Sequence, residues 1–389
     1  MVHTPIYLDN HATTRCDPRV VEAMLPYFSE AFGNASSTSH RFGWDAKDAV
    51  DRSREQVAAL INADPRRVVF TSGATEASNL AIKGIIQPLL RSSSSTPPHI
   101  ITNEAEHRAT LDPIKRLQRI GADVTVLPVD EFGRVAVQQV ADALRNETSL
   151  VSIMLANNEI GTINPVAEIS EVCRSRNLLL HCDAVQAVGR IPVDIEELGA
   201  DLVSLSAHKL YGPKGVGALI VRRGSRRARP EALFDGGGHE NGLRSGTLPV
   251  PLIVGFGRAC QLAHKSRSED TARIESLRDE LWGQLNTRLG GLHLNGHPTE
   301  RLPGNLNVSF DGVDGDVLMN SLKEIAVSSG SACTSADPEP SHVLRAIGRS
   351  DELTRASIRF GIGRFNSREE IDFAIDYVVS TVNRLRTST

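Results

Sequence analysis

The stretch Ser204–Gly215, Ser-Leu-Ser-Ala-His-Lys-Leu-Tyr-Gly-Pro-Lys-Gly, joins a strand pattern to groups that can do chemistry. The apolar run Asp201–Leu205 predicts a short buried strand. Ser206, His208 and Lys209 follow where that strand should end. Sheets of α/β proteins bind ligands at this edge, and a lysine amine can form a Schiff base with an aldehyde. The alternative is a surface lysine in a polar loop, but the chain has only seven lysines against thirty-six arginines.

Polar or small residues also follow four other predicted strands. They are Thr71–Thr75 after Phe70, Glu104–His107 after Thr102, Ala156–Gly161 after Leu155, and Asp183–Gln186 after Cys182. Ala74 and Thr75 open a predicted helix, whose free backbone N–H groups can hold a phosphate. Taken singly, His107 fits a core histidine and Asp183 a helix N-cap. Because parallel strands end at one edge, we expect all five groups to form one ligand pocket.

The kind of ligand follows from this set of groups. A dinucleotide site would need Gly-x-Gly-x-x-Gly after the first strand, and neither that pattern in a suitable unit nor a phosphate-binding Walker sequence is present. Pyridoxal phosphate, an aldehyde with a phosphate and a basic ring nitrogen, fits better. Lys209 would hold the aldehyde, and Asp183 would keep the ring nitrogen protonated.

The other pocket residues have expected roles toward the same cofactor. Gln186 is expected to hydrogen-bond the ring hydroxyl, and His107 to lie over the ring face. The residues expected around the phosphate are Ala74, Thr75, Ser206 and His208.

Seven apolar runs predict the strands that would position these groups. They are Arg67–Phe70, His99–Thr102, Asp123–Leu127, Leu150–Leu155, Asn177–Cys182, Asp201–Leu205 and Val216–Val221. Most are too apolar for half-exposed strands, and helical patterns separate several of them. Together they predict an α/β fold with a mostly parallel seven-stranded sheet and helices on both faces.

The pattern changes near Pro249. A long helical region, interrupted around Gly255 and Gly257, is predicted to run to Gly290. A smaller α+β unit follows, with strands at Asn305–Phe310 and Ser357–Phe360 and a last helix from the capping box Ser367-Arg-Glu-Glu. We therefore expect a large domain at 16–260, and a small domain made of 1–15 and 261–389.

Composition excludes several classes of function. A formal net charge of −4 gives no sign of a nucleic-acid or membrane-surface partner, and no apolar run is long enough to cross a membrane. The N-terminus lacks the pattern of a signal peptide. Five scattered cysteines without a Cys-x-x-Cys pair predict a reduced, cytoplasmic protein with neither a disulfide framework nor a metal site.

The residues also resemble a known family along nearly the whole chain. The matching motifs are Tyr7–Thr14, Phe32–Ser37, Ser72–Glu76, Glu106-His107, Asn157–Gly161, Asp183–Gln186, Ser206–Gly215, Gly236–Glu240, Arg244–Thr247, Ser328–Ser335 and Ser357–Phe360. In these motifs the chain resembles the NifS/IscS-type cysteine desulfurases, which are class V aminotransferase-like pyridoxal-phosphate enzymes of fold type I.

This resemblance implies a substrate, products and partners. The substrate would be L-cysteine, and the products alanine and an enzyme persulfide. Arg359 and Asn158 would hold the substrate carboxylate, with Asn158 also beside the cofactor. In the implied homodimer, Thr247 would reach the partner's cofactor phosphate. A sulfur acceptor or iron–sulfur scaffold protein would take the sulfur. An iron–sulfur cluster would meet Cys333 only transiently, as cargo. The chain ends at Thr389, before the longer tail that housekeeping members use to dock a scaffold, so the acceptor stays open.

The residues around Cys333 fit the implied sulfur carrier. Cys333 lies in Ser328–Pro340, a run of small and turn-forming residues without an apolar anchor, which predicts a mobile, exposed loop. An exposed thiol can ionise, attack sulfur and carry it as a persulfide. The alternative is an incidental surface cysteine. Cys173 and Cys182, in contrast, have the apolar neighbours of buried residues.

These expectations combine into one reaction. Lys209 would act as the base at the substrate α-carbon, Cys333 would attack the substrate sulfur, and His107 would supply a proton. The alternatives are an aminotransferase or a selenocysteine lyase on the same scaffold, or a non-catalytic protein that binds through the same pocket. An aminotransferase has no use for the Cys333 thiol. A binding protein has no need of Lys209, Asp183 and His107 together.

Overall fold

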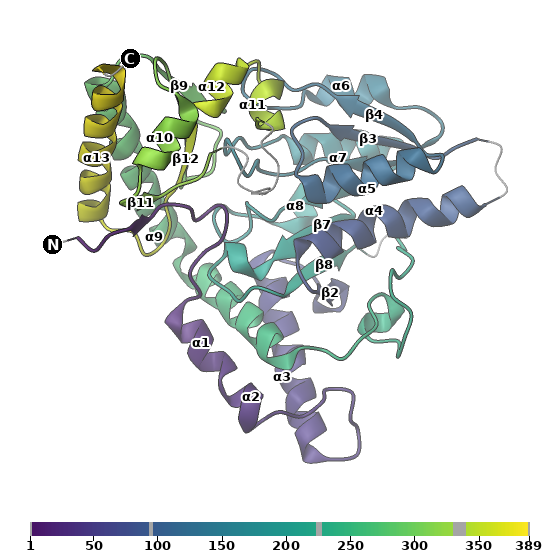
Figure 1. Cartoon of the computed structure of the whole chain (residues 1–389). Helices are drawn as coiled ribbons and strands as arrows, with labels where there is room; N and C mark the ends of the chain where they lie inside the picture. The colour runs from purple at the N-terminus through teal and green to yellow at the C-terminus, as the bar shows by residue number, and fades with distance from the viewer. Residues whose placement is uncertain (1, 93–95, 223–227, 330–339, 388–389) are drawn as a thin grey trace.

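A seven-stranded sheet forms the centre of the larger part of the molecule (Figure 1). The computed structural model describes residues 2–92, 96–222, 228–329 and 340–387. In spatial order the strands are β2 (Val68–Thr71), β8 (Gly217–Val221), β7 (Leu202–Ser206), β6 (Leu179–Asp183), β5 (Thr148–Ser152), β3 (His99–Asn103) and β4 (Asp123–Leu127). Only β8 runs against its neighbours. All seven predicted strands are found, and the sheet is mostly parallel as predicted.

Helices cover both faces of this sheet because each strand is apolar on both sides. On β2, Val69 packs on one face and Phe70 on the other. One face is covered by α4 (Ala74–Arg91) and α5 (Arg108–Arg119). The other carries α3 (Arg41–Leu60), α6 (Val137–Ala143), α7 (Val166–Ser175) and the first half of α9 (Val250–Arg288). Shorter helices are α1 (Pro18–Met24), α2 (Pro26–Ser29) and α8 (Ile195–Leu198), with 3-10 turns at Pro65–Arg67, Ala207–Lys209 and Glu240–Gly242.

The C-terminal part has its own sheet and hydrophobic core. Its antiparallel strands are β12 (Ser357–Gly361), β10 (Asn305–Phe310) and β9 (Leu292–Asn295). A parallel pair joins β1 (Ile6–Tyr7) to β11 (Ile325–Ala326), which brings the N-terminus into this part. The helices are α10 (Gly315–Ser321), α11 (His342–Ala346), α12 (Asp351–Arg355) and α13 (Arg368–Thr387). The predicted strands at β10 and β12 are present, whereas the short β9 was not predicted.

Two structural details bear on the predicted organisation. The capping box before α13 is formed, since Ser367 N donates to Glu370 Oε2 and Glu370 N donates to Ser367 Oγ. Ile6 and Leu8 pack in the C-terminal core with Ile274 of α9, while Ala263 of the same helix packs in the core of the large sheet. The division into domains at 15/16 and 260/261 stays a prediction.

The predicted interruption of the long helix is wrong. α9 runs without a break from Val250 to Arg288. Gly255 and Gly257 do not bend the helix; they allow other helices to pack closely against it. A Cβ at Gly255 would lie 2.5 Å from Met24 Sδ, and one at Gly257 would lie 2.7 Å from Ser53 Cα. The glycines let α1 and α3 approach the helix axis closely. Within the described ranges, no helix is long and apolar enough to span a membrane.

A buried carboxyl group fixes the connection between β3 and α5, which carries His107. Glu106 is fully buried, and its Oε1 accepts hydrogen bonds of 2.6 Å from both Asn103 Nδ2 and Met154 N. Its Oε2 has no hydrogen-bond partner among the described residues. Burial raises the pKa of Glu106 to about 8, and the nearby Asp183 carboxylate adds to this. Glu106 is therefore uncharged at neutral pH.

This raised pKa predicts a pH-dependent cost to stability. An unfolded glutamate has a pKa of about 4.3, so between about pH 4.3 and 8 the folded state keeps a proton that the unfolded state has lost. The stability contributed by Glu106 is thus complete below about pH 4.3 and lost as the pH rises toward 8. We expect Glu106→Gln to gain stability relative to wild type between pH 5 and pH 8, by up to roughly 1.4 kcal/mol for each pH unit. Urea unfolding at both pH values measures this; an unchanged difference would contradict it.

The two kinds of glycine in α9 predict opposite effects of alanine. In an open helical position, alanine is more favourable than glycine by up to about 1 kcal/mol. A Cβ at Gly283 meets nothing within 4 Å, so Gly283→Ala should raise the free energy of unfolding by about that amount. Gly257→Ala should lower it by about 1–3 kcal/mol, because the backbone of α3 must move. Equilibrium denaturation of the two variants tests the pair, and stabilisation by both would show that Gly257 is not a packing residue.

Candidate active site: a cavity at the strand ends

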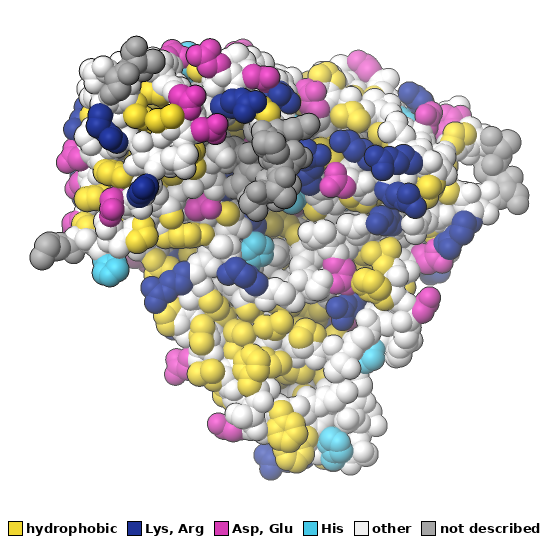
Figure 2. All heavy atoms as spheres, viewed as in Figure 1, with side chains coloured by type: hydrophobic (Ala, Val, Ile, Leu, Met, Phe, Trp, Pro, Cys, Tyr) yellow, Lys and Arg dark blue, Asp and Glu magenta, His cyan; other side chains and the backbone are white. Residues whose placement is uncertain are grey.

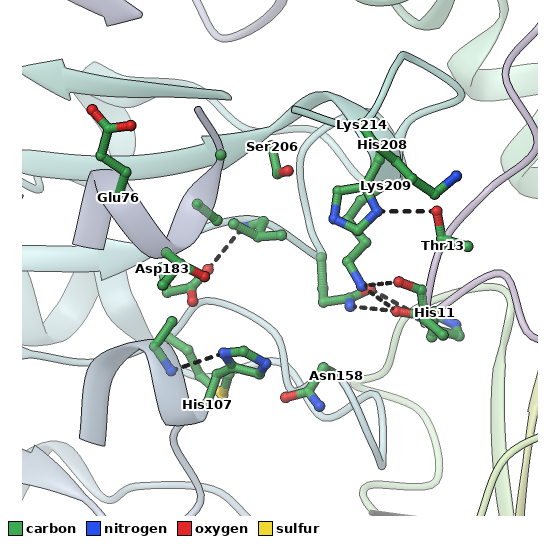
Figure 3. A pocket seen from close by; sticks show the side chains of 18 of the residues that line it. His11, Thr13, Glu76, His107, Asn158, Asp183, Ser206, His208, Lys209 and Lys214 are labelled. Atoms are coloured by element: carbon green, nitrogen blue, oxygen red, sulfur yellow. Dashed lines mark hydrogen bonds between the residues drawn. The ribbon is translucent and has the colours of Figure 1, made fainter. Parts of the chain in front are cut away.

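The groups that follow the strands line one cavity of about 560 Å³ (Figure 3). It lies at the carboxyl ends of β2, β3, β5, β6 and β7. Among its lining residues are the predicted Ala74, Thr75, His107, Asn158, Asp183, Gln186, Ser206, His208, Lys209 and Arg359. Thr247 is exposed and does not line this cavity, and Cys333 lies outside the described residues. The geometry thus brings together every described residue predicted for the site except Thr247.

Lys209 lies in the 3-10 turn directly after β7. Its Nζ donates hydrogen bonds of 2.6 Å to the backbone oxygens of His11 and Ala12 (Figure 3). The ammonium group is thus bound by two uncharged hydrogen-bond acceptors. The positive charge lowers the pKa of both His107 and His208 and also opposes the rise in the pKa of Asp183. Burial is the main cause of all three pKa shifts; Lys209 adds to its effect on the two histidines and counteracts it at Asp183.

Asp183, the last residue of β6, places a buried carboxylate in the cavity wall. Only 6% of the residue is exposed, and its Oδ1 accepts one hydrogen bond of 3.0 Å from Val185 N. Burial raises the pKa of Asp183 to about 6. A cation at this point would lower that pKa again, because an opposite charge favours the ionised form. The carboxylate is suited to a protonated ring nitrogen.

The first turn of α4 has the properties of a phosphate cradle. Its N-cap, Gly73, has φ +153° and ψ −179°, a conformation almost confined to glycine. No side chain caps the helix, so the backbone N–H groups of Ala74 and Thr75 face no capping oxygen. Such N–H groups, together with the helix dipole, favour an anion. Ser206 and His208 line the same cavity.

His107 is an uncharged imidazole at the start of α5. Its Nδ1 accepts a hydrogen bond of 3.1 Å from Ala109 N, which places the proton of the neutral ring on Nε2. Burial lowers the pKa of His107 to about 4, and Lys209 and His342 contribute to this. At neutral pH the residue can donate a hydrogen bond from Nε2, and it carries no positive charge of its own.

A second polar end of the cavity is formed by Arg359 of β12 and Asn158. Arg359 is only 1% exposed; its NH1 donates to Asn158 O at 3.0 Å and its NH2 to Asp9 Oδ1 at 2.9 Å. Arg359 Nε and Asn158 Oδ1 are buried without hydrogen-bond partners in the described part of the chain. An unpaired buried donor and an unpaired buried acceptor on residues that line one cavity indicate a polar ligand, because leaving such atoms unpaired is costly.

Sequence reasoning missed the N-terminal wall of this cavity. His11 Nδ1 lies 2.9 Å from Gln186 Oε1, and Gln186 Nε2 donates to His11 O at 3.0 Å. Thr13 Oγ1 lies 3.1 Å from His208 Nδ1. The polar run 9–14 was visible in the sequence, but its spacing does not show which residues it meets: His11 and Thr13 contact Gln186 and His208 side chains that lie far away along the chain, and one of the bonds uses a backbone oxygen. Lys214 also lines the cavity and was not predicted.

The described cysteines differ from the predicted sulfur carrier. Cys173, Cys182 and Cys260 are buried, as predicted for the first two. Burial raises the pKa of the Cys182 and Cys260 thiols well above the ordinary value. Burial also raises the pKa of Cys16, which is partly exposed. The thiols of Cys16, Cys182 and Cys260 therefore do not ionise readily.

Comparison with known proteins gives the family. The profile of the aminotransferase class-V family matches residues 6–373. A cysteine desulfurase IscS of Anaeromyxobacter sp. (strain Fw109-5) is 53% identical over 382 residues, which cover 98% of this chain and 93% of that protein. A cysteine desulfurase of Rattus norvegicus is 49% identical and is covered over 84% of its length by 98% of this chain.

Solved structures agree with this. A NifS-like protein superposes with a TM-score of 0.89 at 37% identity, over 98% of this chain and all of that one. A structure described as SspA in complex with cysteine gives a TM-score of 0.81 at 34% identity, over 93% of this chain and all of that one. The expected fold, enzyme class and family are thereby confirmed. The chain belongs to the aminotransferase class-V family and, within it, to the cysteine desulfurases.

Proposed function

We propose that this enzyme binds pyridoxal phosphate in the cavity at the strand ends and transfers the sulfur of L-cysteine to Cys333. The observation that carries this proposal is the meeting of Lys209, the buried Asp183 and the uncapped start of α4 in one cavity with the buried Arg359. The SspA structure in complex with cysteine, at 34% identity, supports the choice of substrate.

The residues of the cavity fit the parts of this cofactor. The N–H groups of Ala74 and Thr75, with Ser206 and His208, would hold the phosphate. Asp183 would hold the protonated ring nitrogen. When bound, pyridoxal phosphate supplies an aldehyde for the substrate amine and a ring that withdraws electrons from the substrate α-carbon.

Two further residues would fix the ring. His107 would lie against the ring face, and its neutral state avoids placing a second cation beside Lys209. Gln186 was expected to bind the ring hydroxyl, but its amide is engaged with His11. To bind the ring hydroxyl as well, Gln186 would have to share its amide between the hydroxyl and His11. Asn158, whose Oδ1 has no partner among the described residues, is the neighbouring amide in the cavity wall.

Arg359 would bind the substrate carboxylate, and Lys209 would move the proton. The Arg359 Nε–H is buried and has no hydrogen-bond partner among the described residues, so a carboxylate there would form a charge-assisted hydrogen bond out of contact with water. Lys209 Nζ would take the proton from the substrate α-carbon. His107 Nε2, which carries the imidazole proton, would assist proton return to the product.

Chain length limits how far Cys333 can lie from this cavity. Arg359 N donates to Ser328 O at 2.7 Å, so residue 328 is fixed beside the substrate end. Five residues further on, the Cα of Cys333 lies at most about 18 Å away. Its thiolate would attack the substrate sulfur, forming an S–S bond as the C–S bond breaks. L-cysteine and the Cys333 thiol would give alanine and a Cys333 persulfide, without an external oxidant or reductant.

A homodimer is part of the same proposal. Leu25, Phe28, Phe32, Phe42 and Trp44 are each more than half exposed, around α1, α2 and the start of α3, where hydrophobic side chains gather in the lower part of Figure 2. Such a surface is unusual on a monomer. Thr247 would then contact the cofactor phosphate of the partner subunit. Arg244, three residues earlier, pairs with Glu76 at the edge of the cavity.

Two further expectations stay predictions. They are the sulfur acceptor, for which an iron–sulfur scaffold protein is one candidate, and the cytoplasmic location.

An aminotransferase or a selenocysteine lyase is less favoured than a desulfurase, because the relatives named above are cysteine desulfurases.

The function is tested with the purified enzyme, pyridoxal phosphate, L-cysteine and a thiol reductant. We expect equal amounts of alanine and sulfide, and without reductant a persulfide on Cys333. Transamination would instead yield a keto acid, and activity only with selenocysteine would identify a lyase. A folded, cofactor-loaded enzyme that makes no alanine from cysteine would refute the proposal.

Replacing Cys333 should separate the two halves of the reaction. Cys333→Ser should keep the visible absorption band of the bound cofactor and exchange the substrate α-proton with solvent, because those steps use Lys209. It should form neither alanine nor a protein persulfide, a loss of at least about a thousandfold. Cys260→Ser is the matched control, since its buried thiol lies outside the cavity. A persulfide on another cysteine, with Cys333→Ser still active, would remove Cys333 from the mechanism.

A further inference from the structure

The short helix α11 packs against connections that follow strands of the large sheet, although it belongs to the C-terminal part in sequence. Val343, Leu344 and Ile347 are buried in a separate small core with Ala105 and Ile160. Ala105 lies in the β3–α5 connection, and Ile160 lies in the turn after β5. In Figure 1, α11 lies beside the large sheet and away from α13. This helix is therefore docked on the connections that carry His107 and Asn158.

A buried hydrogen bond fixes the first end of α11. Ser341, its N-cap, donates from Oγ to Glu159 Oε2 and accepts from Leu344 N at 3.1 Å. Ser341 and Glu159 are 4% and 5% exposed. The Glu159 turn is itself held, since Glu159 O accepts hydrogen bonds from Asn305 and Asn307 side chains at 3.2 and 3.1 Å. The contact thus joins the start of α11 to a turn that is itself held by hydrogen bonds.

A second hydrogen bond lies next to the first. His342 Nε2 is 2.9 Å from Glu106 O. The carbonyl oxygen can only accept, so the proton of His342 must lie on Nε2. Burial lowers the pKa of His342, which agrees with a neutral ring. Each of the two contacts is one residue away from the cavity wall, because Glu106 precedes His107 and Glu159 follows Asn158.

The same segment is held at its other end. Ser328 pairs with Arg359 through backbone hydrogen bonds, including Arg359 N to Ser328 O at 2.7 Å. Residues 328 and 341, on either side of Cys333, are therefore both attached to residues adjoining the substrate end of the cavity.

From this arrangement we infer that Ser341 and His342 are positioning residues for the sulfur-transfer step. They fix the chain eight residues after Cys333 on the Glu159 and Glu106 turns. This inference rests on the proposed function of Cys333. A misplacement of about 1 Å can slow a reaction by about a hundredfold, so loss of one anchor should slow thiol attack by about ten- to a hundredfold. Cofactor binding and the action of Lys209 should be unaffected.

The first test is Ser341→Ala in the cofactor-loaded enzyme. We expect a ten- to hundredfold slower single-turnover formation of the Cys333 persulfide from L-cysteine, with wild-type α-proton exchange and an unchanged KM. The matched control is Ser350→Ala, since Ser350 caps α12, which has the same length, by the same kind of bond to Leu353 N, at an exposed position. Ser350→Ala should keep the wild-type rate.

Conservative variants separate positioning from general destabilisation. His342→Gln can still donate an N–H to Glu106 O and should keep more activity than His342→Phe. Glu159→Gln keeps an acceptor for Ser341 and should be closer to wild type than Glu159→Ala.

Three results would overturn the inference. The first is a wild-type rate of persulfide formation in both Ser341→Ala and His342→Phe. The second is a loss of α-proton exchange in these variants that equals their loss of persulfide formation. The third is a rate of persulfide formation in Ser350→Ala that is as low as in Ser341→Ala. If wild type itself forms neither alanine nor persulfide, the proposed function fails instead.

Discussion

The contact between the Lys209 ammonium group and the segment Asp9–Thr13 holds the whole site together. Lys209 Nζ donates to the oxygens of His11 and Ala12 from the large sheet. From the C-terminal part, Arg359 NH2 binds Asp9 Oδ1, and Gly361 O accepts from Asn10 N. One short segment, which forms a turn after Asp9, thus lies between two separately packed parts of the molecule. The partly buried Lys209 and the buried Arg359 both donate hydrogen bonds to this segment, and both side chains line the cavity.

Burial explains most of the electrostatics in this space. Without a ligand, it raises the pKa of Asp183 to about 6 and lowers the pKa of His107 and His208 to about 4, with Lys209 acting in the same direction on both histidines. A ligand that brings a cation to Asp183 and an anion to the start of α4 reduces these costs at both ends. The groups are arranged for a dipolar ligand, and the neutral His107 adds no further positive charge to the cavity wall.

The sequence predicted the strands and the residues at their ends better than it predicted the contacts between distant residues. Buried parallel strands are continuous apolar runs, so all seven strands and the groups at their ends were identified from residue type and order. Arg359 and the roles of Cys333 and Thr247 came from the resemblance, since nothing in their spacing links them to β6 or β7. The continuity of α9 through Gly255 and Gly257 depends on the approach of α1 and α3, and tertiary packing of this kind leaves no local signal. His11 acts through its backbone oxygen, which every residue possesses.

The central claim, that Lys209 is the lysine that carries the cofactor, is tested most directly by borohydride reduction of the pyridoxal-phosphate-loaded enzyme, followed by peptide mass spectrometry. Seven lysines are present in the chain, and Lys214 lines the same cavity, so the labelled peptide distinguishes Lys209 from the other lysines. The account predicts a stable phosphopyridoxyl group on Lys209 alone, and its loss, together with the visible absorption band, in Lys209→Ala. Labelling of Lys214 in the wild-type enzyme, or an unchanged band in Lys209→Ala, would contradict it.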